Sequence, residues 1–311
     1  MPFDESRPYP SPTGASLYVY TKRPAGRPIG VVQVNHGLAE HALRYARFAD
    51  ALAEAGFLTV VHDHRGHGRT TAADAPRGVY AAADGARLLI ADIDAVHDLI
   101  AAEAPGLPVI AFGHSAGGLA ALNYVLAHSD RLAGAAIWNA NFSAGLAARL
   151  ARVLLAWERF RLGSDVPSRL LPRLTFRAWA RQMPDRRTDF DWLSRDAAEV
   201  DAYVADPLCG FDASVSLWGD LFDLIEAGAD DASFAAVRRD LPFNLVGGAA
   251  DPSTFHGRAV EALAARLRRL GFSNLISTIY PETRHESLNE LNRNLITAEF
   301  VAWARRVVEA A

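Results

Sequence analysis

The segment that decides the fold is LPVIAFGHSAGGLAALNYVLA, residues 107–127. Its first part, Val109–Phe112, is a short apolar run typical of a buried strand, and Gly118–Ala127 has the composition of a helix. Between them lies the G-x-S-x-G pattern of residues 113–117. Its small residues permit a sharp strand-to-helix turn. We therefore predict that the hydroxyl of Ser115 is exposed at a helix N-terminus, where free N–H groups favour negative charge.

Strands and helices alternate over most of the remaining chain. Apolar runs predict strands at residues 16–22, 29–35, 57–63, 109–112, 134–139, 241–247 and 275–280. Amphipathic spacing predicts helices at residues 43–55, 83–103, 118–127, 257–270 and 288–310. This alternation is typical of an α/β protein whose mostly parallel central sheet has helices on both faces.

The alternation stops in one long stretch. We assign residues 1–140 and 216–311 to a core and residues 141–215 to an inserted helical cap, or lid, over the ligand-binding edge of the sheet. One helical face of the cap is apolar, and arginines lie elsewhere on the same helix. The apolar residues are Leu146, Leu150, Val153, Leu154 and Trp157, and the arginines are Arg149, Arg152 and Arg159. The apolar face predicts packing on the core; the alternative is a lid that lines an acyl-chain pocket or touches a lipid surface.

Composition excludes several classes of protein. The 311 residues carry a net charge of −4 without a Lys/Arg block, which argues against nucleic acid as a partner. The single cysteine, Cys209, excludes an internal disulfide and a cysteine zinc cluster, and suits a reducing compartment. Residues 1–14 lack the pattern of a secretory signal, and no apolar run is long enough to cross a membrane. We expect a soluble, cytoplasmic protein; the sequence has no signal for a particular oligomeric state.

A serine hydroxyl needs a base and a group that orients the base. His285 follows the last predicted strand, and Asp251 follows the strand at 241–247, so both belong to the sheet edge that carries Ser115. The chain order Ser, Asp, His is that of one of the three main serine hydrolase arrangements. Asp223 is the alternative to Asp251 as the acid, but it lies near the cap. His256 is the alternative to His285 as the base, but it begins a predicted helix.

Acyl transfer also needs two N–H donors for the oxyanion. The N–H of Ala116 follows the serine, and the N–H of Leu38 lies in the loop after an early strand, where Gly37 allows the backbone to turn. A metal site is the alternative role for the histidines in this part of the chain, which are His36, His41, His62, His64 and His67. No cluster of cysteines and carboxylates completes such a site, so we expect these histidines to act in tight turns and hydrogen bonds.

Four motifs resemble one branch of a known family. They are HGLAEHALRY (36–45), DHRGHG (63–68), GHSAGG (113–118) and ADP (250–252), and they resemble the monoacylglycerol lipases and bacterial lysophospholipases of the α/β-hydrolases. DPL at 206–208 also matches, and the similarity spans residues 15–308. The resemblance implies an α/β-hydrolase fold with Ser115 as nucleophile, Asp251 and His285 as its partners, and Leu38 and Ala116 as oxyanion donors. This chain has Ala116 where many members carry methionine, and its segment 141–200 matches only in length and helical character.

These observations predict a serine hydrolase that cleaves carboxylic esters of the monoacylglycerol or lysophospholipid type through an acyl-enzyme. Its partner is a small-molecule or lipid ester, and neither cofactor nor metal is required. A thioesterase or a small-ester or peptide hydrolase of the same fold is the first alternative. A non-catalytic α/β-hydrolase that binds a ligand is the second. A dehalogenase is disfavoured because its nucleophile is an aspartate, and this chain has Ser115.

Overall fold

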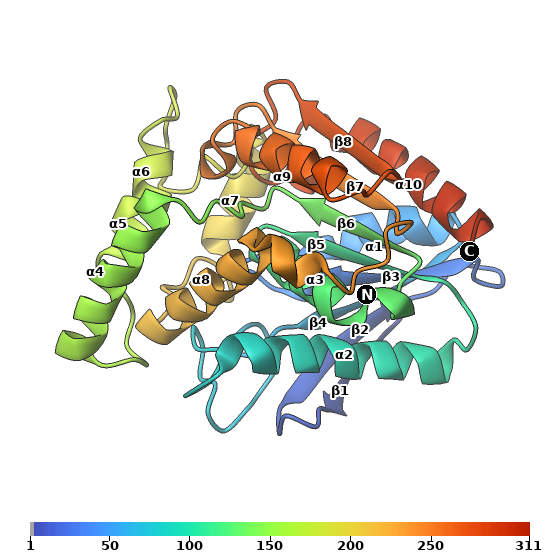
Figure 1. The fold of residues 1–311 in the computed structure, drawn as a ribbon, viewed down its shortest axis with the longest axis horizontal. Helices are drawn as coiled ribbons and strands as arrows, with labels where there is room; N and C mark the ends of the chain where they lie inside the picture. The colour runs from blue at the N-terminus through green and yellow to red at the C-terminus, as the bar shows by residue number, and fades with distance from the viewer. Residues whose placement is uncertain (1–2) are drawn as a thin grey trace.

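The computed structural model describes residues 3–311, and its centre is one eight-stranded sheet. The strands are β1 (Glu5–Pro10), β2 (Ser16–Lys22), β3 (Gly30–Asn35), β4 (Phe57–Asp63), β5 (Val109–His114), β6 (Gly134–Trp138), β7 (Phe243–Gly248) and β8 (Leu275–Tyr280). Their order is β1-β2-β4-β3-β5-β6-β7-β8. β2 pairs antiparallel with β1 and β4, whereas all pairs from β4 to β8 are parallel (Figure 1). This is the α/β-hydrolase fold, as predicted.

Ten α-helices surround the sheet within the part of the chain described. They are α1 (Ala46–Glu54), α2 (Gly85–Glu103), α3 (Ala116–His128), α4 (Leu146–Leu162), α5 (Leu171–Leu174), α6 (Phe176–Ala180), α7 (Ala197–Ala205), α8 (Val215–Ala229), α9 (Arg258–Arg269) and α10 (Arg293–Glu309). Short 3-10 turns are η1 (Ala42–Tyr45), η2 (Ser129–Arg131), η3 (Asp231–Phe234), η4 (Pro252–Thr254) and η5 (Ser287–Asn289). None of the helices within residues 3–311 has the length and apolar content that crossing a bilayer requires.

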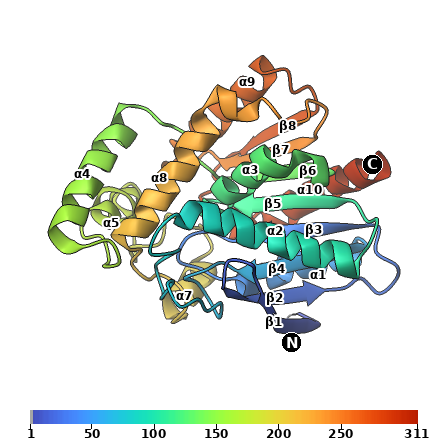
Figure 2. The same ribbon diagram turned by 60° about the horizontal axis from the view of Figure 1, so that its bottom comes forward.

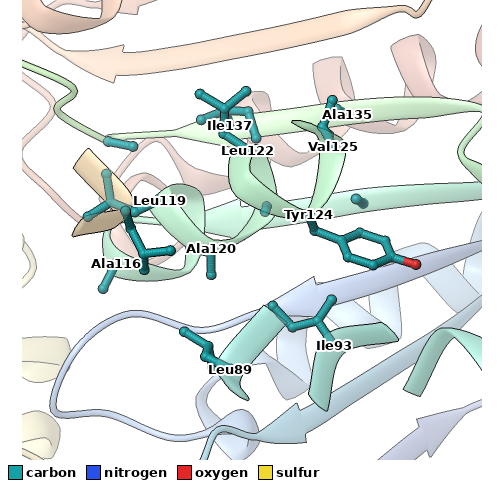
Figure 3. Packing of buried hydrophobic residues seen from close by; sticks show 14 of the residues in the cluster. Leu89, Ile93, Ala116, Leu119, Ala120, Leu122, Tyr124, Val125, Ala135 and Ile137 are labelled. Carbon is teal, nitrogen blue, oxygen red and sulfur yellow. The ribbon is translucent and has the colours of Figure 1, made fainter. Parts of the chain in front are cut away.

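Two cores lie on opposite faces of the sheet. Side chains alternate along β5, so that Val109 and Ala111 belong to one core and Ile110 and Phe112 to the other. The first core includes residues of α2, α3, α8 and α9, and the second includes residues of α1 and α10. Figure 3 shows Leu89 and other side chains of α2 facing those of α3 across the first core. Burial on both faces explains why the central strands are almost continuously apolar.

Strand β1 was not predicted from the sequence. It contains Pro8 and Pro10, residues that are unfavourable inside a sheet because they lack an N–H group. β1 lies at the edge and pairs only with β2, so the missing donors disturb no second neighbour. The predicted helix at 288–310 is also wrong at its start. η5 ends at Asn289, and α10 begins at Arg293, because the buried Glu290 between them accepts hydrogen bonds from backbone N–H groups of the surrounding loops.

Five α-helices, α4 to α8, lie between β6 and β7. α8 packs against α2 and α3, and α4 packs against α8. In Figures 1 and 2 α4 is the helix farthest from the sheet. Its orientation contradicts the prediction that the face containing Leu146, Val153 and Trp157 packs on the core, since all three are exposed. The helix instead buries Leu155, which lies close to Gly219 of α8.

Candidate active site

Ser115 lies between the end of β5 and the start of α3. Its backbone has φ 56° and ψ −121°, a strained conformation for a residue with a side chain. The turn is held by the N–H of Ser115, which donates to the carbonyl of Trp138 at 2.9 Å. It also requires glycine at 117, because a Cβ there would lie 2.1 Å from the carbonyl oxygen of Asn35. α3 therefore approaches β3 closely, and the Ser115 hydroxyl is directed toward the loops at the end of the sheet.

His285 lies in the loop between β8 and η5, within hydrogen-bond distance of both predicted partners. Its Nε2 is 2.8 Å from Oγ of Ser115, and its Nδ1 is 3.0 Å from Oδ2 of Asp251. Asp251 is buried directly after β7. The two rivals lie elsewhere: Asp223 pairs with Arg152, and His256 is exposed.

The carboxylate of Asp251 is surrounded by donors. The N–H and hydroxyl of Ser253 donate to Oδ1 at 2.9 and 2.6 Å, and Thr254 and Asn139 donate to Oδ2 at 3.0 and 3.2 Å. Burial opposes ionisation, but His285 and these hydrogen bonds outweigh it and lower the pKa of Asp251 to about 2. Asp251 is therefore an anion at neutral pH and accepts a hydrogen bond from His285.

The loop after β3 contains Leu38, the other predicted oxyanion donor. The N–H groups on either side of Leu38 are used within the protein: Gly37 donates to Glu40 at 2.6 Å, and Ala39 donates to His67 at 3.3 Å. Leu38 and Ala116 both line the cavity that contains Ser115. Ala116 is the first residue of α3, and a helix leaves its first N–H groups without intrahelical partners.

A buried charge network joins this loop to the loop of His285. Arg44 donates to Glu40 at 2.7 Å and to both oxygens of Glu286 at 2.6 and 2.7 Å. Burial opposes ionisation of both acids, but Arg44 keeps the pKa of Glu40 and of Glu286 below their usual range. His114, whose Nε2 donates to the carbonyl of His285 at 2.9 Å, lies 3.7 Å from Glu40. Because of Glu40, the pKa of His114 is raised even though burial opposes its charge.

The histidines beneath this loop form hydrogen bonds. His36 accepts from the N–H of His64 at 2.9 Å, and Nδ1 of His64 lies 3.1 Å from Nε2 of His62. Burial lowers the pKa of His36 to about 4 and those of His62 and His67 to about 3, so these rings are neutral at pH 7. Neutral rings can pack closely, and the ring centroids of His36 and His64 lie 4.2 Å apart with their planes tilted by 39°.

His41 lies in a second cluster, with Asp206 and Cys209, and the potential ligand atoms lie within 4.8 Å of one another. Nε2 of His41 donates to Asp206 at 2.8 Å, which joins the loop after β3 to the end of α7. Burial raises the pKa of Cys209, so its thiol is protonated at neutral pH.

A cavity of about 800 Å³ contains Ser115 and His285. Apolar side chains from α4, α5, α6 and α8 form most of its wall: Leu146, Leu150, Leu154, Leu171, Phe176, Trp179, Trp218, Leu221, Phe222 and Ile225. Among the described residues that line the cavity, none is Lys or Arg. Two of the lining residues, Glu40 and Glu286, are acidic. The ring of Trp192 closes the wall next to His285, with centroids 4.8 Å apart. The site therefore combines polar groups around Ser115 with a large, mostly apolar compartment.

Comparisons with known proteins identify the family to which the chain belongs. The family model described as serine aminopeptidase, S33, matches residues 26–292. The chain belongs to this family of α/β-hydrolases. Monoacylglycerol lipase of Mycolicibacterium smegmatis is 29% identical over 289 residues, 89% of this chain and 88% of the relative. Human monoglyceride lipase is 27% identical over 246 residues, 76% of this chain and 70% of the relative. The protein lies in the monoglyceride lipase-like branch, as its motifs indicated.

Solved structures share the fold of this chain. A lipase in its open form has a TM-score of 0.84 at 29% identity and covers 98% of this chain and 99% of its own. A carboxyl esterase from Bacillus coagulans also has a TM-score of 0.84, at 22% identity, with 98% of both chains covered. The family match and the two monoacylglycerol lipase relatives identify the protein as a serine hydrolase that cleaves carboxylic esters.

Sequence reasoning missed several residues of the site. Asn139 and Ser253 contact Asp251, and Arg44 joins two loops that are far apart in the chain. One signal was available for Asn139 and Ser253: each polar residue follows a parallel strand at the edge that carries Ser115. No sequence spacing indicates the contact between Arg44 and Glu286.

Proposed function

We propose that the protein hydrolyses neutral monoacylglycerol-type esters with Ser115, His285 and Asp251 as its catalytic triad. One observation carries the proposal: the continuous hydrogen-bonded series from Ser115 through His285 to Asp251 opens into a largely apolar cavity. In this arrangement His285 can take the serine proton, and the anion of Asp251 can stabilise the resulting imidazolium.

The reaction has two halves. Oγ of Ser115 attacks the ester carbonyl carbon while its proton moves to Nε2 of His285. The bond to the alcohol oxygen then breaks, and His285 returns the proton to that oxygen. Water next loses a proton to His285 and attacks the acyl-enzyme, which releases the fatty acid and restores Ser115. The N–H groups of Leu38 and Ala116 are our candidates for stabilising both oxyanions.

The charge of the cavity favours an uncharged alcohol. A lysophospholipid would bring a phosphate beside Glu40 and Glu286, with no Lys or Arg among the described lining residues to pair with it. Glycerol carries no charge and avoids this cost. The apolar compartment suits a long acyl chain, since ligand pockets bury most of a ligand's apolar surface. Hence we favour monoacylglycerol over lysophospholipid.

We assign the segment 141–215 to a cap that forms the acyl-chain compartment and makes transient contact with a lipid surface. Phe160, Val153 and Trp157 project from α4 into solvent, and Phe160 is 93% exposed. Exposed arginines of the same region, such as Arg149 and Arg161, suit an anionic interface. The buried, unpaired Cys209 is in keeping with our expectation of a cytoplasmic location.

The test is a substrate panel with the wild type, Ser115→Ala and, as a matched control, Ser273→Ala on the exposed surface. The panel contains 1-monooleoylglycerol, oleoyl-lysophosphatidylcholine, oleoyl-CoA and leucine p-nitroanilide. We expect preference for the monoacylglycerol and a loss of at least about 10³-fold in kcat for S115A alone. Preference for the thioester or the anilide would support the alternative hydrolases. Failure of a fluorophosphonate to label Ser115 would support a non-catalytic ligand-binding protein.

A further inference from the structure

The hydroxyl of Ser253 lies between the acid and the base of the proposed triad. Its Oγ is 2.6 Å from Oδ1 of Asp251 and 2.8 Å from Nδ1 of His285. The direct distance from Nδ1 of His285 to Oδ2 of Asp251 is 3.0 Å. The ring nitrogen is thus at least as close to the serine oxygen as to the carboxylate, and all three groups are buried.

The number of available protons determines which of the three groups donates each hydrogen bond. Asp251 is an anion and can only accept, so the single hydroxyl proton of Ser253 must be donated to Oδ1. The oxygen of Ser253 then has lone pairs free toward His285. The short contact at 2.8 Å is satisfied only when Nδ1 of His285 carries a proton and donates it. That proton has two acceptors, Ser253 and Asp251.

We propose that Ser253 is a positioning residue, whose hydroxyl oxygen holds the Nδ1–H of His285 together with Asp251. A proton retained at Nδ1 leaves Nε2 free to accept from Ser115, which lies 2.8 Å away. The inference rests on the proposed function, and it adds a second acceptor where a triad needs only one.

A structural role is the competing explanation. The backbone N–H of Ser253 donates to Asp251 at 2.9 Å and so begins η4, which needs no hydroxyl at all. The hydroxyl could also act only by orienting Asp251. Thr254 provides the matched control for that effect, because its hydroxyl donates to Oδ2 of Asp251 at 3.0 Å, whereas that of Ser253 lies within hydrogen-bond distance of both Asp251 and His285.

The experiment measures kcat and KM for p-nitrophenyl butanoate with S253A and T254V, each made in the wild type and in D251A. Both single variants should lower kcat, S253A by about tenfold. In D251A, T254V should have no further effect on kcat, because the Thr254 hydroxyl is linked to His285 through the missing carboxylate and otherwise bonds the backbone of Gly257 and Asp251. S253A should again lower kcat, because Ser253 lies within hydrogen-bond distance of Nδ1 and can accept from the imidazolium that forms during the reaction even without Asp251. Loss of the S253A effect in D251A would overturn the proposal.

A second pair of variants, S253T and S253V, controls for a loss of kcat that is caused by misfolding. Thr and Val have the same shape, so S253T should keep kcat within about threefold of the wild type, and S253V should fall about tenfold, as S253A does. Equal kcat for S253T and S253V would also overturn the proposal. S115A separates the two hypotheses. If S115A is inactive and S253A equals the wild type, only the role of Ser253 is wrong. If S115A stays active, the proposed function is wrong as well.

Discussion

Arg44 binds both carboxylate oxygens of Glu286, at 2.6 and 2.7 Å, although the two residues are separated by 242 positions. Arg44 also pairs with Glu40 in the loop of the proposed oxyanion donor Leu38. One buried guanidinium therefore holds the loop of the base and the loop of the oxyanion donor together. The integrity of the site and the stability of the fold are consequently linked at this residue.

Arg44→Met should destabilise the protein strongly. The substitution leaves Glu40 and Glu286 buried without their cation, and breaking such a pair costs about 3–5 kcal/mol. Urea unfolding followed by circular dichroism measures the change. The control is Arg186→Met, whose pair with Asp189 is exposed and whose loss should change the free energy of unfolding by less than about 1 kcal/mol. An equal loss of unfolding free energy in the two variants would contradict the role of Arg44 in stabilising Glu40 and Glu286.

The fold and the three proposed triad residues could be predicted because local signals converge. Strands buried on both faces are continuous apolar runs, and the turn at Ser115 needs small residues in sequence. Asp251 and His285 each follow a predicted strand, so a parallel sheet brings them to one edge without any knowledge of side-chain contacts.

The remaining features depend on contacts between distant segments. The face of α4 that is buried is decided by its packing on α8, where Leu155 lies close to Gly219, and not by the most apolar stripe of the helix. The link between Arg44 and Glu286 likewise has no local signal. β1 was not predicted because its prolines are unfavourable inside a sheet. They are acceptable here only because β1 lies at the edge.

Acidification should unfold the protein through its neutral, buried histidines. Burial lowers the pKa of His36 to about 4 and those of His62 and His67 to about 3, against about 6.5 in an unfolded chain. Between these values the unfolded chain binds more protons, so the free energy of unfolding falls as pH decreases from about 6.5. Each histidine contributes up to about 1.4 kcal/mol per pH unit. His114, whose pKa is raised, has the opposite dependence and loses its contribution as pH rises.

Urea midpoints at pH 7, 6 and 5 measure this loss. His62→Gln removes one of the titrating groups. The free energy of unfolding should then depend less steeply on pH, by the equivalent of about one proton taken up on unfolding. A variant with the same slope as the wild type would show that His62 is not buried and neutral in the folded protein. The range from pH 5 to 6.5 lies above the pKa of Asp251, about 2, so the triad carboxylate does not contribute to the change.

Phe160→Asp should reduce activity at lipid surfaces while sparing activity in solution. The side chain is exposed at the outer face of α4, and a charge there opposes insertion among lipids. We expect at least about threefold slower hydrolysis of 1-monooleoylglycerol in vesicles of phosphatidylcholine and phosphatidylglycerol. Hydrolysis of soluble p-nitrophenyl butanoate should not change. Val204→Asp, an exposed position on α7, is the control, and an equal loss in both variants would contradict contact through α4.

Gly117→Ala should disrupt the turn that presents Ser115. The added Cβ would lie 2.1 Å from the carbonyl oxygen of Asn35 and 2.4 Å from that of His36. Both are backbone atoms of the adjacent strand end, so α3 can accept the methyl group only by moving away from β3. We expect a loss of at least about 1–3 kcal/mol in the free energy of unfolding.

Gly26→Ala is the matched control, because the space around Gly26 is open and the change should stay within about 0.5 kcal/mol. Thermal unfolding and the rate of labelling by a fluorophosphonate measure stability and the presentation of the hydroxyl separately. Because Ser115 directly precedes α3 and the proposed donor Ala116 is the first residue of α3, the stability of G117A and its labelling rate should fall together. A stable G117A that labels slowly would place the defect in the turn alone, whereas normal labelling would show that the close approach of α3 to β3 is not required.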